Sequence, residues 1–96
     1  MQFVILCKDK PDGLDLRMAT RQVHLDYLKD VGGANLLGAG PFLDDQDRPT
    51  GSMLIVEFPS EAEARSFAQN DPYAKAGLFV DVEIRRWRWG VKPPAA

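Results

Sequence analysis

One histidine and one distant aspartate are the residues of this chain whose types best suit acid–base chemistry. His24 is the single histidine of the sequence, and Asp71 stands far downstream, directly before Pro72 and Tyr73. Histidine exchanges protons near neutrality because its ordinary pKa is about 6.5. A carboxylate that accepts from one imidazole N–H leaves the other ring nitrogen as a free base. The pair therefore predicts a catalytic site, His24 with Asp71 as its orienting residue, if the fold brings them together.

A purely structural interpretation competes with this prediction. His24 could be a partly buried helix residue whose ring bonds to a carbonyl group. Asp71 could simply mark the end of a helix, because the residue before a proline avoids the helical conformation. The sequence pattern alone leaves both interpretations open.

Two further polar residues are candidates for substrate binding. Ser52 follows Gly51 at the start of a predicted strand, where its hydroxyl could bind a substrate oxygen or be an ordinary strand residue. A Ser-His-Asp hydrolase is disfavoured, because the segment 50–54 lacks the G-x-S-x-G turn that exposes such a serine. Arg21, one turn before His24, could hold an anionic group of the substrate or pair with carboxylates at the surface.

Two aromatic residues complete the set of candidates. Tyr73 and Phe42 could line a substrate cavity, or they could fill the core. Gly38 and Gly40 lie two residues apart and would share one face of a strand, leaving bare backbone for a ligand or for a partner chain.

The composition is that of an ordinary soluble domain. The chain has 96 residues, a formal net charge of −2, 45% hydrophobic residues and 27% charged residues, which fit one domain over residues 1–90 with a flexible tail at 91–96. Cys7 has no partner for an internal disulfide, and no long apolar segment or basic leader is evident. These features predict a cytoplasmic protein that does not enter a membrane.

The pattern of apolar residues and turn signals predicts six elements that would position these side chains. Strands are predicted at 2–8, 34–42, 52–58 and 79–89. A first helix would begin at Leu16 with Asp15 as its cap, carry a stripe of Met18, Arg21, Leu25 and Leu28, and end at Gly32-Gly33. A second would follow the capping box Ser60-x-x-Glu63 and stop before Asp71.

This order, βαββαβ, predicts a ferredoxin-like α+β plait, in which a four-stranded antiparallel sheet carries both helices on one face. His24 and Asp71 would then lie on the same side of the sheet. The strand at 34–42 ends in Pro41 and is expected at an edge. The strands at 2–8 and 52–58 are apolar on both faces, so a second copy of the chain is expected to cover the open face as a homodimer.

Metal, cofactor and nucleic-acid sites find little support. One histidine and one cysteine cannot form a zinc set, and the acidic loop 44–47 does not continue as an EF-hand. RNA-recognition motifs share the βαββαβ order, but the strand 52–58 lacks their basic and aromatic pattern. The run Arg85-Arg86-Trp87-Arg88-Trp89 is better explained as protection of an edge strand. We expect no metal, no cofactor and no nucleic acid.

Five segments in a fixed order resemble the YciI-like (YCII-related) family over residues 1–89. They are Arg21-x-x-His24-Leu25-x-Tyr27-Leu28, Gly38-Ala39-Gly40-Pro41-Phe42, Gly51-Ser52, Asp71-Pro72-Tyr73-x-x-Ala76-Gly77-Leu78-Phe79 and Val82-Glu83-Ile84-Arg85. The resemblance implies a dimeric α/β barrel of ferredoxin-like subunits, a cleft holding His24 and Asp71, and a small organic substrate. One branch of the family resembles dehydrochlorinases of chlorinated hydroxyaromatics.

Together these observations give a lead hypothesis and an alternative. The lead is a small homodimeric enzyme, a cofactor-independent lyase or isomerase, that uses His24 and Asp71 on a small carbonyl or hydroxyaromatic compound. The alternative is a non-catalytic dimeric module that binds a small metabolite or assists another enzyme.

Overall fold

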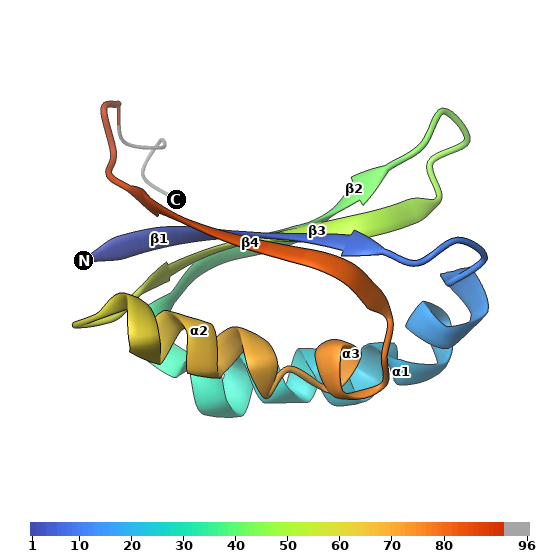
Figure 1. Cartoon of the computed structure of the whole chain (residues 1–96), viewed down its shortest axis with the longest axis horizontal. Coiled ribbons are helices and arrows are strands. Elements are labelled where there is room, and N and C mark those ends of the chain that lie inside the picture. The colour runs from blue at the N-terminus through green and yellow to red at the C-terminus, as the bar shows by residue number, and fades with distance from the viewer. Residues whose placement is uncertain (92–96) are drawn as a thin grey trace.

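A computed structural model describes residues 1–91 and shows a four-stranded antiparallel sheet with all of its helices on one face (Figure 1). The strand order is β2-β3-β1-β4. The strands are β1 (Gln2–Asp9), β2 (Leu36–Leu43), β3 (Pro49–Glu57) and β4 (Phe79–Trp87). The helices are α1 (Leu14–Tyr27), α2 (Glu61–Gln69) and α3 (Pro72–Lys75), and a π-helical turn (Leu28–Gly32) and a 3-10 turn (Gly33–Asn35) follow α1.

This topology is the predicted ferredoxin-like plait. β1 leads through α1 to β2, and β3 leads through α2 to β4, so each connection passes over a neighbouring strand. The two central strands, β1 and β3, pair in antiparallel register from Gln2 opposite Glu57 to Lys8 opposite Gly51. β2 and β4 are the edge strands, as the sequence indicated for both.

The core lies between the sheet and the helices. Alternate residues of the central strands point inward and are buried, and they meet apolar side chains of α2 and of the turn after α1. The buried cluster contains Phe3, Ile5, Cys7, Leu28, Leu54, Val56, Ala64, Phe67 and Ala68. Leu28 and Leu54 of this cluster also line the cavity described below.

The start of α1 differs from the prediction. The helix begins at Leu14 with Gly13 as its N-cap, and no side chain caps it, so the predicted capping role of Asp15 is wrong. The reason is the tight turn before the helix, where a Cβ on Gly13 would lie 2.9 Å from both the Leu78 side chain and the Lys10 carbonyl oxygen. Asp15 instead lies in the first turn, where its negative charge favours the helix dipole.

The buried face of α1 also differs from the predicted apolar stripe. Met18 and Leu25 are 55% and 37% exposed, whereas Arg17, His24 and Leu28 are buried. Helix geometry brings residues seven apart onto one face, and the face carrying Arg17 and His24 turns to the sheet because both side chains find charged partners there.

The second half of the chain follows the predicted pattern more closely. Ser60 caps α2 and its hydroxyl accepts from the backbone N–H of Glu63, which confirms the capping box. The short helix α3 was not predicted. It forms because the Asp71 side chain accepts from the backbone N–H of Tyr73, and Pro72 occupies the first helical position.

Among the described residues, every helix lies on one face of the sheet, and none lies on the outer face (Figure 1). Val4, Leu6 and Ile55 are only partly buried there, and Met53 is exposed. Gly38 and Gly40 share this face, as predicted, and a Cβ on either would meet no atom within 4 Å.

Two remaining predictions concern the C-terminal tail and the absence of a membrane-spanning segment. Beyond Val91, the predicted C-terminal tail lies outside the described residues. Within the part of the chain that is described, no helix is long and apolar enough to cross a membrane.

Candidate functional site

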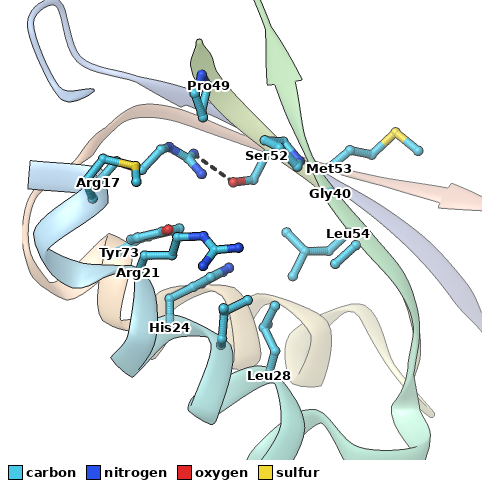
Figure 2. A pocket seen from close by; sticks show the side chains of 14 residues that line it. Arg17, Arg21, His24, Leu28, Gly40, Pro49, Ser52, Met53, Leu54 and Tyr73 are labelled. Atoms are coloured by element: carbon cyan, nitrogen blue, oxygen red, sulfur yellow. Dashed lines mark hydrogen bonds between the residues drawn. The ribbon is translucent and has the colours of Figure 1, made fainter. Parts of the chain in front are cut away.

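A cavity of about 510 Å³ lies on the helix side of the sheet, between α1, β2 and β3. Its walls are mainly apolar, and its polar groups come from α1, β3 and the start of α3 (Figure 2). The polar and aromatic residues that line it are Arg17, Arg21, His24, Ser52 and Tyr73. The remaining wall is formed by Met18, Leu25, Leu28, Ala39, Gly40, Pro41, Pro49, Met53 and Leu54.

His24 and Asp71 meet at the edge of this cavity. The imidazole Nδ1 lies 2.8 Å from Asp71 Oδ1 and 3.1 Å from Oδ2, and both residues are buried. A carboxylate only accepts hydrogen bonds, so the proton between them is assigned to Nδ1. In the neutral form of this imidazole, Nε2 is the nitrogen without a proton, and the ring lines the cavity.

Local structure holds the Asp71 carboxylate in place. Its Oδ1 also accepts from the backbone N–H of Tyr73 at 2.9 Å, because Asp71 is the N-cap of α3. The same Asp-Pro-Tyr sequence that ends the preceding helical stretch therefore aims the carboxylate at His24. The two interpretations of Asp71, helix boundary and partner of His24, are both correct descriptions of its geometry.

Tyr73 packs against the imidazole. The rings of His24 and Tyr73 are stacked with centroids 3.9 Å apart and planes inclined by 15°. Phe79 contacts the Tyr73 ring edge-on at 6.0 Å between centroids. Burial raises the pKa of Tyr73, although the nearby charges of Arg17 and Arg21 oppose that shift. These contacts fix the plane of the His24 ring.

A second buried polar cluster lies beside the first and consists of Asp9, Arg17 and Ser52. Arg17 Nε and Nη2 donate to the two oxygens of Asp9 at 2.6 and 2.9 Å, and Nη2 also donates to Ser52 Oγ at 2.8 Å. The Arg17 guanidinium carbon lies 4.6 Å from the centre of the Tyr73 ring. Burial alone would lower the pKa of Arg17, but the ion pair with Asp9 raises it overall.

Most of the predicted site residues surround one cavity. His24, Ser52, Tyr73 and Arg21 line it, and Asp71 stands behind His24. Phe42 does not join them. It is 45% exposed and belongs to a shallow groove on the outer face of the sheet with Met53 and Ile55, because Phe42 and Ser52 have opposite orientations in their paired strands.

The Ser-His-Asp hydrolase set, which the sequence disfavoured, is not assembled. Ser52 accepts its hydrogen bond from Arg17, and no hydrogen bond joins it to His24 within residues 1–91. The residue before this serine, Gly51, lies close to the backbone of β1. A Cβ at position 51 would collide with the Cys7 carbonyl oxygen. A glycine at 51 thus lets β3 approach β1 closely and places Ser52 at the cavity wall.

Sequence reasoning missed Asp9 and Arg17. The predicted strand at 2–8 stopped one residue short of Asp9, which is the last residue of β1. Arg17 precedes Arg21 by four residues and His24 by seven, a spacing that places all three on one side of a helix. This polar stripe of Arg17, Arg21 and His24 could have indicated the face of the helix that lines the site. The predicted apolar stripe of Met18, Leu25 and Leu28 favoured a different face.

Comparison with known proteins identifies the family. The model of the YCII-related domain matches residues 1–88. The chain belongs to the YCII-related domain family. This agrees with the resemblance of its motifs.

Two curated relatives are similar to this chain over most of their length. Protein YciI of Escherichia coli is 35% identical over 95 residues, which cover 92% of this chain and 97% of the relative. The derivative of benzaldehyde biosynthesis cluster protein C of Emericella nidulans is 32% identical over 74 residues, covering 69% of this chain and 76% of the relative.

A solved structure that is similar to this chain carries a ligand. It is the 5-chloro-2-hydroxyhydroquinone dehydrochlorinase of Burkholderia phenoliruptrix in complex with 2,5-dihydroxybenzoquinone, with 40% identity and a TM-score of 0.85. The alignment covers 94% of this chain and 96% of that one. This similarity supports a small-molecule enzyme of the YciI family.

Proposed function

We propose that this protein is a cofactor-independent lyase or isomerase that acts on a small hydroxyaromatic or carbonyl compound, with His24 as the acid–base residue and Asp71 as its orienting partner. The observation that carries the proposal is the 2.8 Å contact between His24 Nδ1 and Asp71 at the wall of a cavity. A histidine with a purely structural role would need a hydrogen-bond partner for its ring, but its ring would not need to line a cavity.

The geometry suits a proton abstraction. Asp71 holds the Nδ1–H and stabilises the positive charge that develops when Nε2 takes up a proton. In an elimination, the abstracted proton passes to Nε2 and its bonding electrons move into the substrate. The leaving group then departs with its own bonding pair, so no external oxidant is required. An isomerisation would return the proton to another atom of the substrate.

The substrate class is proposed from the cavity and from the similar proteins together. Leu28, Leu54 and Pro41 offer an apolar wall suited to a ring, and the arginines offer charge to an ionised oxygen. The similar dehydrochlorinase was solved with 2,5-dihydroxybenzoquinone. A chlorinated or otherwise substituted hydroxyaromatic is thus the first compound to test.

The active form is proposed to be a homodimer. The outer sheet face is apolar at Val4, Leu6, Met53 and Ile55, and no helix among residues 1–91 covers it. A domain of about 90 residues buries only about 60 to 70% of its unfolded surface, so covering this face would add substantially to its stability. A second copy supplies an equally apolar face. A cytoplasmic location stays a prediction from composition.

Turnover by two variants tests the proposal. Chloride release from 5-chloro-2-hydroxyhydroquinone is measured across pH for the wild type, His24→Ala and Asp71→Asn. We expect both variants to lose about 10²- to 10⁴-fold in kcat/KM. The wild-type rate should fall at acid pH as the base is protonated, and His24→Ala should lack that acidic limb.

Asp71→Asn is a conservative change for the fold. Asparagine still caps a helix, but its amide nitrogen can donate to Nδ1 and stabilise the other imidazole tautomer. Wild-type turnover in both variants would refute the catalytic role. Binding of the compound without turnover by any form would favour the alternative, a metabolite-binding module.

A further inference from the structure

The cluster of Asp9, Arg17 and Ser52 is not used by the proton transfer at His24, although it adjoins the same cavity. Both charged side chains are 5% exposed, and Ser52 is 4% exposed. Burying an ion pair costs solvation energy that its attraction alone rarely recovers. Ser52 of this cluster faces the same cavity as a second arginine, Arg21. Both side chains can therefore contact one ligand.

The direction of the hydrogen bonds in this cluster is fixed. A guanidinium has no acceptor, so Ser52 Oγ must accept from Arg17 Nη2. Asp9 holds the guanidinium by two hydrogen bonds, which fixes its plane. The hydroxyl hydrogen of Ser52 is therefore left to donate elsewhere, and no protein acceptor for it is found among residues 1–91.

The charge of the cavity follows from the same contacts. Asp9 neutralises Arg17 through the ion pair. Arg21, one turn further along α1, points its guanidinium into the cavity between His24 and Leu54 (Figure 2), and no ion pair involving it is found in the described part of the chain. Asp71 also carries a negative charge, but it lies behind the His24 ring and its oxygens are held by His24 and by the Tyr73 N–H. The groups that line the cavity therefore include one arginine without an ion-pair partner and one oriented hydroxyl donor, within mainly apolar walls.

We infer that Ser52 and Arg21 bind an ionised oxygen of the ligand, and that Arg17, held by Asp9, is a positioning residue that turns the Ser52 hydroxyl into an obligate donor. The ligand class is a planar, largely apolar compound that carries an ionised oxygen, such as a phenolate or an enolate. This inference deepens the proposed function, because an electron-rich oxyanion is what expels a leaving group in such an elimination. It concerns binding and does not require turnover.

Equilibrium binding of two matched quinones tests the inference by calorimetry at pH 7.5. The probe is 2,5-dihydroxybenzoquinone, whose hydroxyls ionise. The control is 2,5-dimethoxybenzoquinone, which has the same ring but cannot ionise. The wild type is expected to bind the hydroxyquinone at least tenfold more tightly. Equal affinity for the two compounds, or no binding of the hydroxyquinone at millimolar concentration, overturns the inference.

Variants then assign the roles. Ser52→Ala and Arg21→Gln should each weaken hydroxyquinone binding about tenfold and leave the binding of the dimethoxy compound unchanged, as expected for lost charge-assisted hydrogen bonds. Arg65→Gln removes one positive charge from the exposed surface of α2 and should bind like the wild type. Wild-type affinity in Ser52→Ala overturns the inference.

A double-mutant cycle separates positioning from mere structural support. Arg17→Lys keeps the charge but cannot hold both Asp9 oxygens and Ser52, so it should weaken hydroxyquinone binding. In the Ser52→Ala background the same change should have little further effect, because the group that Arg17 positions is gone. Additive losses would contradict the positioning role. His24→Ala should abolish turnover yet retain the preference for the anion, which keeps this test distinct from that of the proposed function.

Discussion

At the scale of single residues, the described part of the protein buries the polar residues Arg17, His24, Ser52 and Asp71, and each has a hydrogen-bond partner. No buried side-chain nitrogen or oxygen lacks a hydrogen bond within residues 1–91. Unpaired buried polar groups cost several kcal/mol in apolar surroundings, on the order of 2 to 7. The two networks can therefore persist in a small domain, and both leave one hydrogen-bonding atom free for a ligand.

Cys7 provides a pH prediction at this scale. Its thiol is buried among core residues, and burial raises its pKa from 9.0 to about 12. Above pH 9 the thiol of the unfolded chain ionises while the folded one stays protonated. The contribution to stability is thus complete below pH 9 and is lost as the pH rises towards 12, at up to about 1.4 kcal/mol per pH unit.

Urea unfolding between pH 8 and 11 measures this effect. We expect the free energy of unfolding of the wild type to fall more steeply with pH than that of Cys7→Ala, which is less stable throughout but lacks the thiol. The difference between the two slopes isolates Cys7 from the tyrosines that also titrate there. Parallel pH profiles would show that the thiol does not titrate as described.

At the scale of elements, the side chains of Ser60 and Asp71 cap the starts of α2 and α3, and Asp71 thereby takes its place in the site. Asp71 both caps α3 and holds His24, so a local turn and a contact between distant helices share one carboxylate. Gly13 and Gly51 allow close approaches of the backbone, because a Cβ at either position would collide with a backbone carbonyl oxygen. The cavity exists because these turns bring α1, α3 and β3 together.

The capping box of α2 gives a stability prediction. Ser60 Oγ accepts from the Glu63 N–H at 3.3 Å, and its hydroxyl donates to the Glu63 carboxylate at 3.1 Å. Ser60→Ala should lower the free energy of unfolding by about 1 kcal/mol, because one helix N–H loses its acceptor. Ser66→Ala, an exposed serine within the same helix, should be nearly neutral. Chemical denaturation compares them, and equal stability of the two variants would contradict the cap.

At the scale of the whole molecule, one face of the sheet is covered by helices and the other is open (Figure 1). The covered face holds the core and the cavity, and the open face holds apolar side chains and the groove along β2. Large exposed apolar patches commonly mark interaction surfaces. The proposed homodimer assigns this face to a second copy.

Sedimentation analysis checks the dimer. Ile55→Lys places a charge on the open face and should shift the protein to a monomer at micromolar concentration, with the loss of apolar contact and the cost of burying a charge acting together. Val23→Lys alters an apolar residue that is 59% exposed on the helix side and should leave the oligomer unchanged. A wild-type monomer at high concentration, or an unchanged mass for Ile55→Lys, would rule out this interface.

The sequence alone determined the order of the main elements, the plait topology and the capping box at Ser60, because apolar periodicity and turn residues act locally and right-handed crossovers leave few topologies. It named His24 and Asp71 as a possible pair, and the fold decided that the two side chains meet. Tertiary structure decided which face of α1 is buried, the orientation of Phe42 and the cluster of Asp9, Arg17 and Ser52. A buried arginine looks like a surface residue in a sequence until its carboxylate partner is known. That partner, at the end of another strand, lowers the cost of burial only when the fold brings the two charges into contact.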